Sequence, residues 1–208
     1  AEVASPWRAG RTRRVSLRRD DVDAFVFWTR DPRPFRRCLT ALDAGGYPYV
    51  FLITLTGYPR VLEPLVPSAA EALRFFEELA GRIGRRRIAW RYDPLIFTPA
   101  TGPAFHERNF AHLADRLAPF VSRAIVSFFD PYPKALRRLR QAGVDPAAVP
   151  GSPRQRAELL AFMAGVAGRL GLEIQTCAEP DPAGGPPAGA CPPPAVAAGK
   201  CIDTELLN

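Results

Sequence analysis

The cysteines near the end of the sequence are the residues whose type points most directly to chemistry. Cys177 follows an apolar run, Cys191 lies in the tract after it, and Cys201 begins Cys201-Ile202-Asp203. Thiolates that converge from a strand end and a loop hold soft metals and iron–sulfur clusters. The spacing matches no sharp metal-binding pattern, so ordinary unligated cysteines are an equal alternative.

Polar side chains also collect where apolar runs end. In parallel β/α folds, function gathers at the carboxyl ends of the strands. The polar or aromatic residues that we expect at strand ends, or in the loops just after them, are Trp28, Thr29, Thr54, Glu63, Arg91, Asp93, Ser127 and Glu179. The alternative is that such residues only form turns and helix caps.

Arg91 stands out among these residues because it lies inside an expected strand, next to Trp90. A buried arginine needs an anionic partner. Asp93 or Glu63 could supply it. Such a pair either orients an anionic substrate or braces the fold.

The elements that must position these residues alternate between strand and helix. Apolar runs predict strands at 22–29, 49–56, 87–92, 121–129 and 172–176. Helical spacing and capping signals predict helices at 34–44, 68–83, 105–117, 134–142 and 153–170. This order predicts an α/β protein with a parallel sheet and right-handed crossovers. No glycine-rich phosphate loop follows the first strand, which favours a partial or incomplete TIM-like barrel over a doubly wound sheet.

The pattern divides the chain into a barrel-like domain at 1–179 and a segment at 180–208. The second part is a flexible Pro/Gly/Ala-rich insert followed by the last cysteine. Residues 1–21 are basic and are interpreted as an edge strand or an extended lead-in. Cys38 lies on the apolar stripe of the first helix and is expected in the core. His106 and His112 are six residues apart on one helix, so surface or interface roles are favoured over metal binding.

The net charge of +7 comes almost entirely from arginine. This surplus fits nucleic acid or an anionic substrate as a partner. The arginines are spread out, so a compositional bias with solvated charges is the favoured alternative. No run is long and apolar enough to cross a bilayer, and no signal segment opens the chain. Four cysteines are too few for a disulfide scaffold, so we expect a cytoplasmic protein without a membrane partner.

Five motifs occur together in a fixed order. They are Phe27-Trp28-Thr29-Arg30-Asp31-Pro32, Thr54-Leu55-Thr56-Gly57-Tyr58 with Glu63-Pro64-Leu65-Val66-Pro67, Trp90-Arg91-Tyr92-Asp93-Pro94, Cys177-Ala178-Glu179 and Cys201-Ile202-Asp203. This set resembles the uncharacterised prokaryotic domain-of-unknown-function family numbered eighteen-forty-eight. The resemblance implies a barrel-like fold and an iron–sulfur cluster of the [4Fe–4S] type. It implies Cys177 and Cys201 as ligands, with Cys191 as a third candidate.

The sequence also departs from that family. An earlier segment and a later close pair of cysteines are missing, so the chain is expected to be truncated at both ends. The cysteines of the family have been compared with those of radical S-adenosylmethionine enzymes, but the motif C-x3-C-x2-C is absent here. S-adenosylmethionine is therefore a candidate cofactor by analogy alone.

Our first hypothesis is an iron–sulfur enzyme of unknown, anionic substrate. Its expected catalytic residues are Arg91, Asp93, Glu63, Thr54 and Glu179, and its expected cofactor-binding residues are Trp28, Thr29 and Ser127. The second hypothesis is a basic nucleic-acid-binding or repair-associated module. The third is an inactive fragment with a zinc or structural thiol site.

Overall fold

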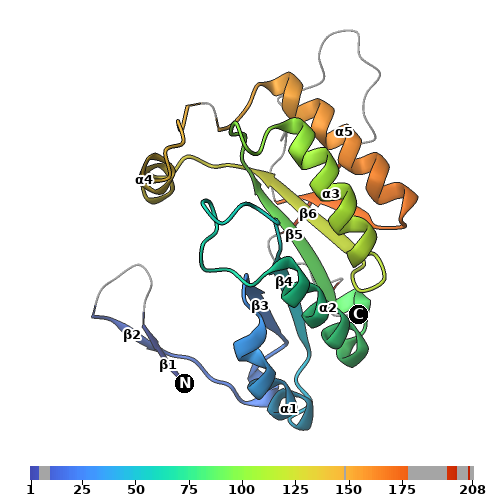
Figure 1. Cartoon of the computed structure of the whole chain (residues 1–208). Coiled ribbons are helices and arrows are strands. Elements are labelled where there is room, and N and C mark those ends of the chain that lie inside the picture. The colour runs from blue at the N-terminus through green and yellow to red at the C-terminus, as the bar shows by residue number, and fades with distance from the viewer. Residues whose placement is uncertain (5–9, 148, 178–195, 201–205, 207–208) are drawn as a thin grey trace.

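The centre of the protein is a sheet of six parallel strands (Figure 1). The computed structural model describes residues 1–4, 10–147, 149–177, 196–200 and 206. The strands are β3 (Phe25–Thr29), β4 (Tyr49–Thr54), β5 (Ile88–Leu95), β6 (Arg123–Phe128), β7 (Glu173–Thr176) and β8 (Ala197–Ala198). They lie side by side in the order in which they occur in the chain. No reversal of strand order occurs among them, so this is not a doubly wound sheet.

Strand β4 shows why these segments form a parallel sheet. All six of its residues are buried, and five of them are apolar or aromatic. Such a run suits a central strand that is covered on both faces. In its register with β5, Thr54 lies opposite Arg91. The predicted polar residues of these two strands therefore stand at the same level of the sheet.

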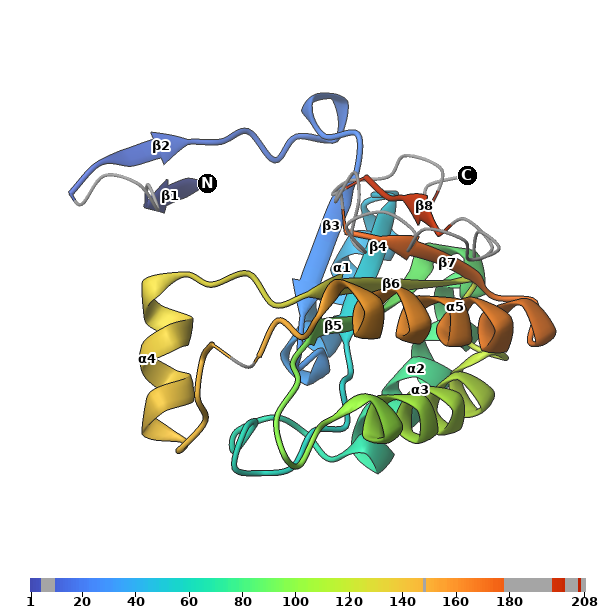
Figure 2. The ribbon, with the colours of Figure 1, turned by 90° about the horizontal axis from the view of Figure 1, so that it is seen from above.

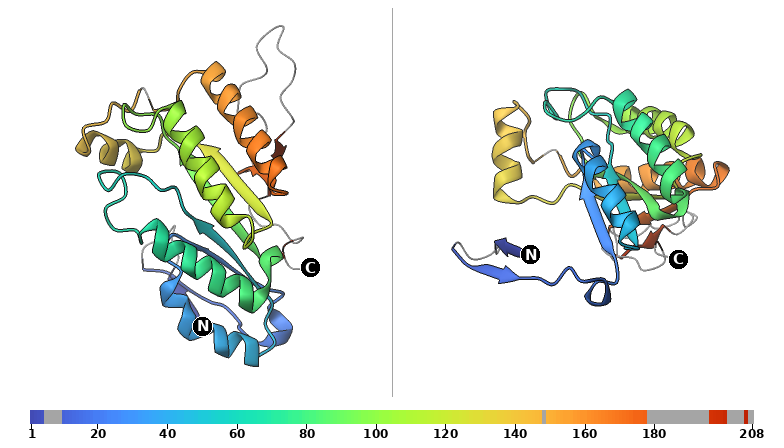
Figure 3. Two further views of the ribbon diagram at one scale, coloured as in Figure 1. Left: turned by 45° about the vertical axis from the view of Figure 1, so that its right-hand side comes forward. Right: turned by 90° about the horizontal axis from the view of Figure 1, so that it is seen from below.

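Four helices pack along one face of the sheet (Figure 3). They are α1 (Arg36–Ala44), α2 (Ala69–Ile83), α3 (Pro103–Leu117) and α5 (Pro153–Arg169). The fifth helix, α4 (Pro133–Gln141), lies beyond the sheet, and its Leu139 joins a smaller cluster with Tyr58 and Val149. Three single-turn 3₁₀ helices, Arg19–Asp21, Arg33–Phe35 and Arg85–Arg87, complete the described elements.

The main core lies between the sheet and those four helices. Phe51, Trp90, Phe110 and Met163 are fully enclosed there. Alternate residues of the strands point to the opposite side, which we call the open face. On it Val50, Leu52, Ala89 and Ile125 form a smaller cluster that Leu206 covers in part. Figure 2 shows α2, α3 and α5 on one side of the sheet, with β8 beside β7 at its edge.

Consecutive parallel strands with helices on one face confirm the predicted partial parallel β/α fold. The helices α1, α2 and α3, which connect the first four strands, and α5, which precedes β7, pack against the same side of the sheet. In the part of the chain that the structure describes, β3 and β8 are the edges of an open sheet. Closure into a barrel is not seen there. None of the described helices is long and apolar enough to cross a membrane.

The chain contains two strand pairings that the sequence did not predict. Residues 1–21 include an antiparallel hairpin of β1 (Glu2–Ala4) and β2 (Thr12–Arg14), which projects away from the sheet (Figure 2). Strand β8 lies inside the tract that was predicted to be a flexible insert, and it pairs in parallel with β7. The edge strand suggested within residues 1–21 thus pairs in a separate hairpin, and the Pro/Gly/Ala-rich tract around β8 lacks an apolar alternation that would predict a strand.

The prediction that Cys38 lies in the core is wrong, because Cys38 is exposed. The buried stripe of α1 runs through Phe35, Leu39 and Leu42. Successive residues of an α-helix are about 100° apart around its axis. Cys38 therefore points away from the sheet although its neighbour Leu39 is 2% exposed.

Candidate functional site

Arg91 is the centre of a polar cluster on the open face. Along β5, Trp90 and Tyr92 point into the main core, so Ala89, Arg91 and Asp93 point to the open face. The Arg91 side chain is 5% exposed and forms an ion pair with the Asp93 carboxylate, which is 13% exposed. This pairing is one of the two that the sequence suggested for a buried arginine.

Cys177 and Trp28 complete this cluster from two other strands. The Nη2 of Arg91 donates a hydrogen bond to the Sγ of Cys177 over 3.2 Å. The guanidinium carbon lies 4.1 Å from the ring centre of Trp28, a cation–π contact. Trp28 is 49% exposed, so its ring covers Arg91 from the solvent side. We call Trp28, Arg91, Asp93 and Cys177 the Arg91 cluster.

One polar atom of this cluster lacks a hydrogen-bond partner. The Nε of Arg91 is buried and has no acceptor among the described residues. Buried donors in native proteins nearly always have a partner. The Nε–H of Arg91 is an exception to this rule in the described residues, as is the Nε–H of Arg156.

Arg30 connects the Arg91 cluster to Glu63. Its Nη1 forms an ion pair with the Glu63 carboxylate, and its Nη2 donates to the carbonyl oxygen of Asp93 over 3.1 Å. The other oxygen of Glu63 accepts a hydrogen bond of 2.6 Å from the Thr56 hydroxyl. Glu63 is thus held by the end of β4 and by the residue just after β3.

A cavity of about 230 Å³ opens at the carboxyl end of β4. Its polar lining is Arg30, Thr54, Thr56, Arg60, Glu63 and Ser68. We call it the β4 cavity. It brings together Thr54 and Glu63, two of the predicted catalytic residues, and Arg30 links it to the Arg91 cluster.

The remaining predicted residues take other places. The Thr29 hydroxyl bonds to the backbone of Asp31, accepting from its N–H and donating to its carbonyl, which is a turn-forming role. Ser127 is half-buried on β6, and its hydroxyl makes no hydrogen bond in the described residues. Glu179, Cys191 and Cys201 lie outside the described residues.

The expectation of a surface or interface role fails for His106, which is fully buried. Its Nε2–H donates to the carbonyl of Ile96 over 3.1 Å, because a carbonyl can only accept. Its Nδ1 accepts from the Tyr92 hydroxyl at 3.0 Å, and that hydroxyl accepts from Asn109 at 2.9 Å. Burial lowers the pKa of His106 and raises that of Tyr92, so both groups are neutral.

This buried network braces the wall of the β4 cavity. Asn109 also donates to the carbonyl of Thr56 over 2.6 Å. The end of β4 is thereby tied to α3 and, through Tyr92, to β5. His106 acts as a structural residue of this brace. No sequence pattern indicated this role, since it depends on the loop at 96–101, which folds back onto the helix of His106.

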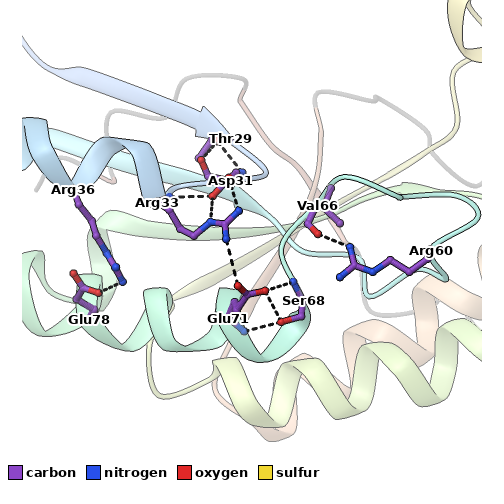
Figure 4. Close-up of polar contacts among 9 residues, drawn as sticks. All are labelled: Thr29, Asp31, Arg33, Arg36, Arg60, Val66, Ser68, Glu71 and Glu78. Atoms are coloured by element: carbon purple, nitrogen blue, oxygen red, sulfur yellow. Dashed lines mark hydrogen bonds and ion pairs between the residues drawn. The ribbon is translucent and has the colours of Figure 1, made fainter.

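A second polar network joins the loop after β3 to α2 (Figure 4). Arg33 pairs with Asp31 at 2.8 Å and reaches Glu71 at 3.3 Å. The hydrogen bond from Arg33 lowers the pKa of Asp31. Glu71 in turn completes a capping box with Ser68 at the start of α2, and these bonds lower its pKa. The network fixes the helix that borders the β4 cavity.

Arg30 is the residue of the site that sequence reasoning missed. It follows directly after the expected end of a strand and lies within a quoted motif, yet a charged residue after a strand usually faces solvent. Its side chain is 39% exposed. The sequence signal that could have found Arg30 was Trp28, two positions earlier. Residues that are two positions apart in an extended segment point to the same face of the sheet.

The described side chains include no group of three or more His, Cys, Asp or Glu residues that lie together so as to hold a metal ion. Of the three predicted ligands, Cys177 is the one within the described part of the chain. Cys177 offers one thiol on the open face, next to the Arg91 guanidinium.

Fold and site together define a class: a partial parallel β/α protein with an arginine-centred polar site at the carboxyl ends of its strands. The chain belongs to the family described as a domain of unknown function, DUF1848, whose model matches residues 1–208. This agrees with the resemblance that the five sequence motifs carry. The chain has no match among the curated proteins.

Proposed function

We propose that this protein binds an iron–sulfur cluster on the open face of its sheet and acts as an enzyme on an anionic substrate. The observation that carries the proposal is the hydrogen bond from buried Arg91 to the Cys177 sulfur. A thiolate is the form of cysteine that binds metal. The guanidinium of Arg91 is held in place by Asp93 and donates a charge-assisted hydrogen bond to that sulfur.

Cys177 would be one ligand, and Cys201 and Cys191 would supply further thiolates. Thiolate ligands suit iron–sulfur clusters and zinc. A bound iron–sulfur cluster supplies one-electron chemistry, and hydrogen bonds to its sulfurs tune its reduction potential. Arg91 would tune that potential, because its Nη2 donates a hydrogen bond to the Cys177 sulfur.

The polar residues beside the cluster would bind the substrate. Arg91 and Arg30 supply positive charge, and Asp93 and Glu63 fix their orientation through ion pairs. Trp28 shields Arg91 from solvent, which strengthens its electrostatic interactions. Thr54 lines the adjoining cavity and offers a hydroxyl.

Anaerobic reconstitution with iron and sulfide tests the proposal. The chain is compared with Cys177→Ser and with Cys38→Ser, in which the exposed cysteine of α1 is the matched control. We expect the original chain and Cys38→Ser to retain the same iron and acid-labile sulfide per chain, and Cys177→Ser to lose most of both. Equal iron in all three, or tight zinc binding with no iron uptake, would reject the iron–sulfur function.

The β1–β2 hairpin supports nucleic-acid binding as a second candidate function. Arg11, Arg13 and Arg14 are exposed on it, and it stands apart from the sheet (Figure 1). Contacts between arginine side chains and the phosphates of a nucleic acid weaken steeply as the salt concentration rises. Fluorescence anisotropy with mixed oligonucleotides across a salt series measures this.

The matched variants are Arg11→Gln with Arg13→Gln, and Arg86→Gln with Arg87→Gln, a basic pair after α2. The second candidate predicts that the hairpin pair alone weakens binding. No binding at low salt, or equal weakening by both pairs, would remove it.

A further inference from the structure

The β4 cavity has the size and lining of a site for a small ligand. Its volume of about 230 Å³ lies below the range of about 300–1,000 Å³ that is typical for drug-sized ligands. It is bordered by the end of β4, the loop that follows it and the first turn of α2. Cavities at the carboxyl ends of parallel strands are the usual place for ligands in such folds.

One of the two arginines that line the cavity has no carboxylate partner in the described residues. Glu63 is its acidic lining residue, and both of its oxygens are engaged, one by Arg30 and one by Thr56. Arg60 donates to the backbone carbonyl of Val66 at 2.6 Å (Figure 4) and to that of Pro64 at 3.4 Å. In the described part of the chain no carboxylate forms an ion pair with Arg60.

Glu71 is the nearest other acid, and it is already engaged. Its carboxylate bonds to Ser68 and to Arg33. Arg60 contributes the smallest of the influences that lower the pKa of Glu71, so the two groups interact weakly. The guanidinium of Arg60 therefore remains able to meet an incoming anion at the cavity.

Thr54 provides an independent observation that points to a ligand. It is 8% exposed and lines the cavity, yet its hydroxyl has no hydrogen-bond partner in the described residues. This hydroxyl can both donate and accept a hydrogen bond, and in the described residues neither capacity is used by the protein. A ligand oxygen in the cavity would satisfy it.

We propose that the β4 cavity binds a small oxyanion, a phosphate or carboxylate group, between the Arg60 guanidinium and the Thr54 hydroxyl. Arg30 borders this cavity and also contacts the carbonyl of Asp93, so the bound group lies next to the Arg91 cluster. The role of this group as part of the substrate rests on the proposed iron–sulfur function. The binding of the oxyanion does not depend on that function, because none of the three predicted cysteine ligands is among the described residues that line the cavity.

The test is an NMR titration of the metal-free full chain with inorganic phosphate and, separately, with acetate. We expect saturable shifts of backbone amides around the cavity, with Gly57 and Ala69 as reporters. The probe with the lower dissociation constant identifies phosphate or carboxylate as the preferred group. Absence of saturable shifts with both probes would overturn the proposal.

Two variants locate the binding. Thr54→Val keeps the side-chain shape and removes the hydroxyl, and Arg60→Gln removes the charge from an exposed position. Each should raise the dissociation constant about tenfold or more, because each removes a hydrogen bond to a charged ligand. Arg154→Gln on α5 is the control and should bind as the original chain does. Unchanged affinity in both cavity variants, with folding verified by circular dichroism, would contradict the proposal.

A Cys177→Ser chain separates this proposal from the metal function. It should bind the oxyanion as the original chain does, whether or not it has lost its iron. A loss of oxyanion binding in that variant would place the anion at the Arg91 cluster and overturn the assignment to the β4 cavity.

Discussion

The Arg91 guanidinium donates a hydrogen bond of 3.2 Å to the sulfur of Cys177, across 86 positions of the sequence. The two residues come from β5 and from the end of β7, with β6 lying between those strands. Asp93 pairs with the same guanidinium, and Trp28 stacks on it from β3. Arg91 therefore contacts residues from β3, from its own strand β5 and from the end of β7 in one site.

Replacing Arg91 with methionine should destabilise the protein strongly. The change removes the partner of the Asp93 carboxylate, which is 13% exposed, and leaves that charge uncompensated. Breaking a buried pair in this way costs about 3–5 kcal/mol. Urea unfolding followed by circular dichroism measures the loss. Arg154→Met, which breaks an exposed pair with Glu158, should have a far smaller effect, and equal losses in both variants would contradict this account.

Stability should decline as the pH falls below about 6.5 because of His106. Burial lowers the pKa of His106 from its ordinary value of 6.5. Below that value the unfolded chain takes up a proton that the folded chain does not, so the free energy of unfolding decreases as the pH falls. The decrease continues until the pH reaches the lower pKa of the folded state.

The chain has two histidines, which supply a matched pair for this measurement. His106→Gln should flatten the dependence of unfolding free energy on pH between about pH 5 and 6.5. His112→Gln replaces the exposed histidine of the same helix and should preserve that dependence. A slope that survives in His106→Gln would show that another group causes it.

Gly57→Ala should cost more stability than Gly46→Ala. Both glycines have a positive φ, +63° and +65°, and an alanine there costs about 1–2 kcal/mol for its backbone conformation alone. A methyl group on Gly57 would also lie 2.8 Å from the Oδ1 of Asn109, whereas one on Gly46 meets nothing within 4 Å. Asn109 is held by its bonds to Thr56 and Tyr92, so it cannot move freely.

Thermal unfolding of both glycine variants checks this prediction. Gly57→Ala should also disturb the β4 cavity, which Gly57 lines, and so weaken the binding of the oxyanion probes. If both variants lost the same stability, the Asn109 side chain would be able to move away from the new methyl group without destabilising the protein.

The sequence predicted the sheet well because its strands are apolar on both faces. β4 and β5 read as buried strands, and the parallel order follows from the helices between them. The need of Arg91 for an anionic partner also followed from its position inside a strand. These inferences depend on local pattern and on the cost of burying a charge, both of which are visible in the sequence.

The rest depends on three-dimensional contacts that no local pattern carries. Cys177 and Arg91 meet through the register of three strands, and His106 is buried because a loop returns to its helix. Cys38 was misplaced because one step around a helix separates a core position from an exposed one. Cys191 and Cys201 lie outside the described residues, so their predicted roles remain predictions.

The electron paramagnetic resonance spectrum of the anaerobically reconstituted, dithionite-reduced chain tests the central claim most directly. We predict the signal of a reduced iron–sulfur cluster, absent from Cys177→Ser and retained in Cys38→Ser. In Arg91→Lys the potential at which the signal appears should shift, because the hydrogen-bond donor to the Cys177 sulfur has changed. A signal of equal intensity and potential in all of these chains, or no signal in any, would contradict the claim that Cys177 and Arg91 form a cluster site.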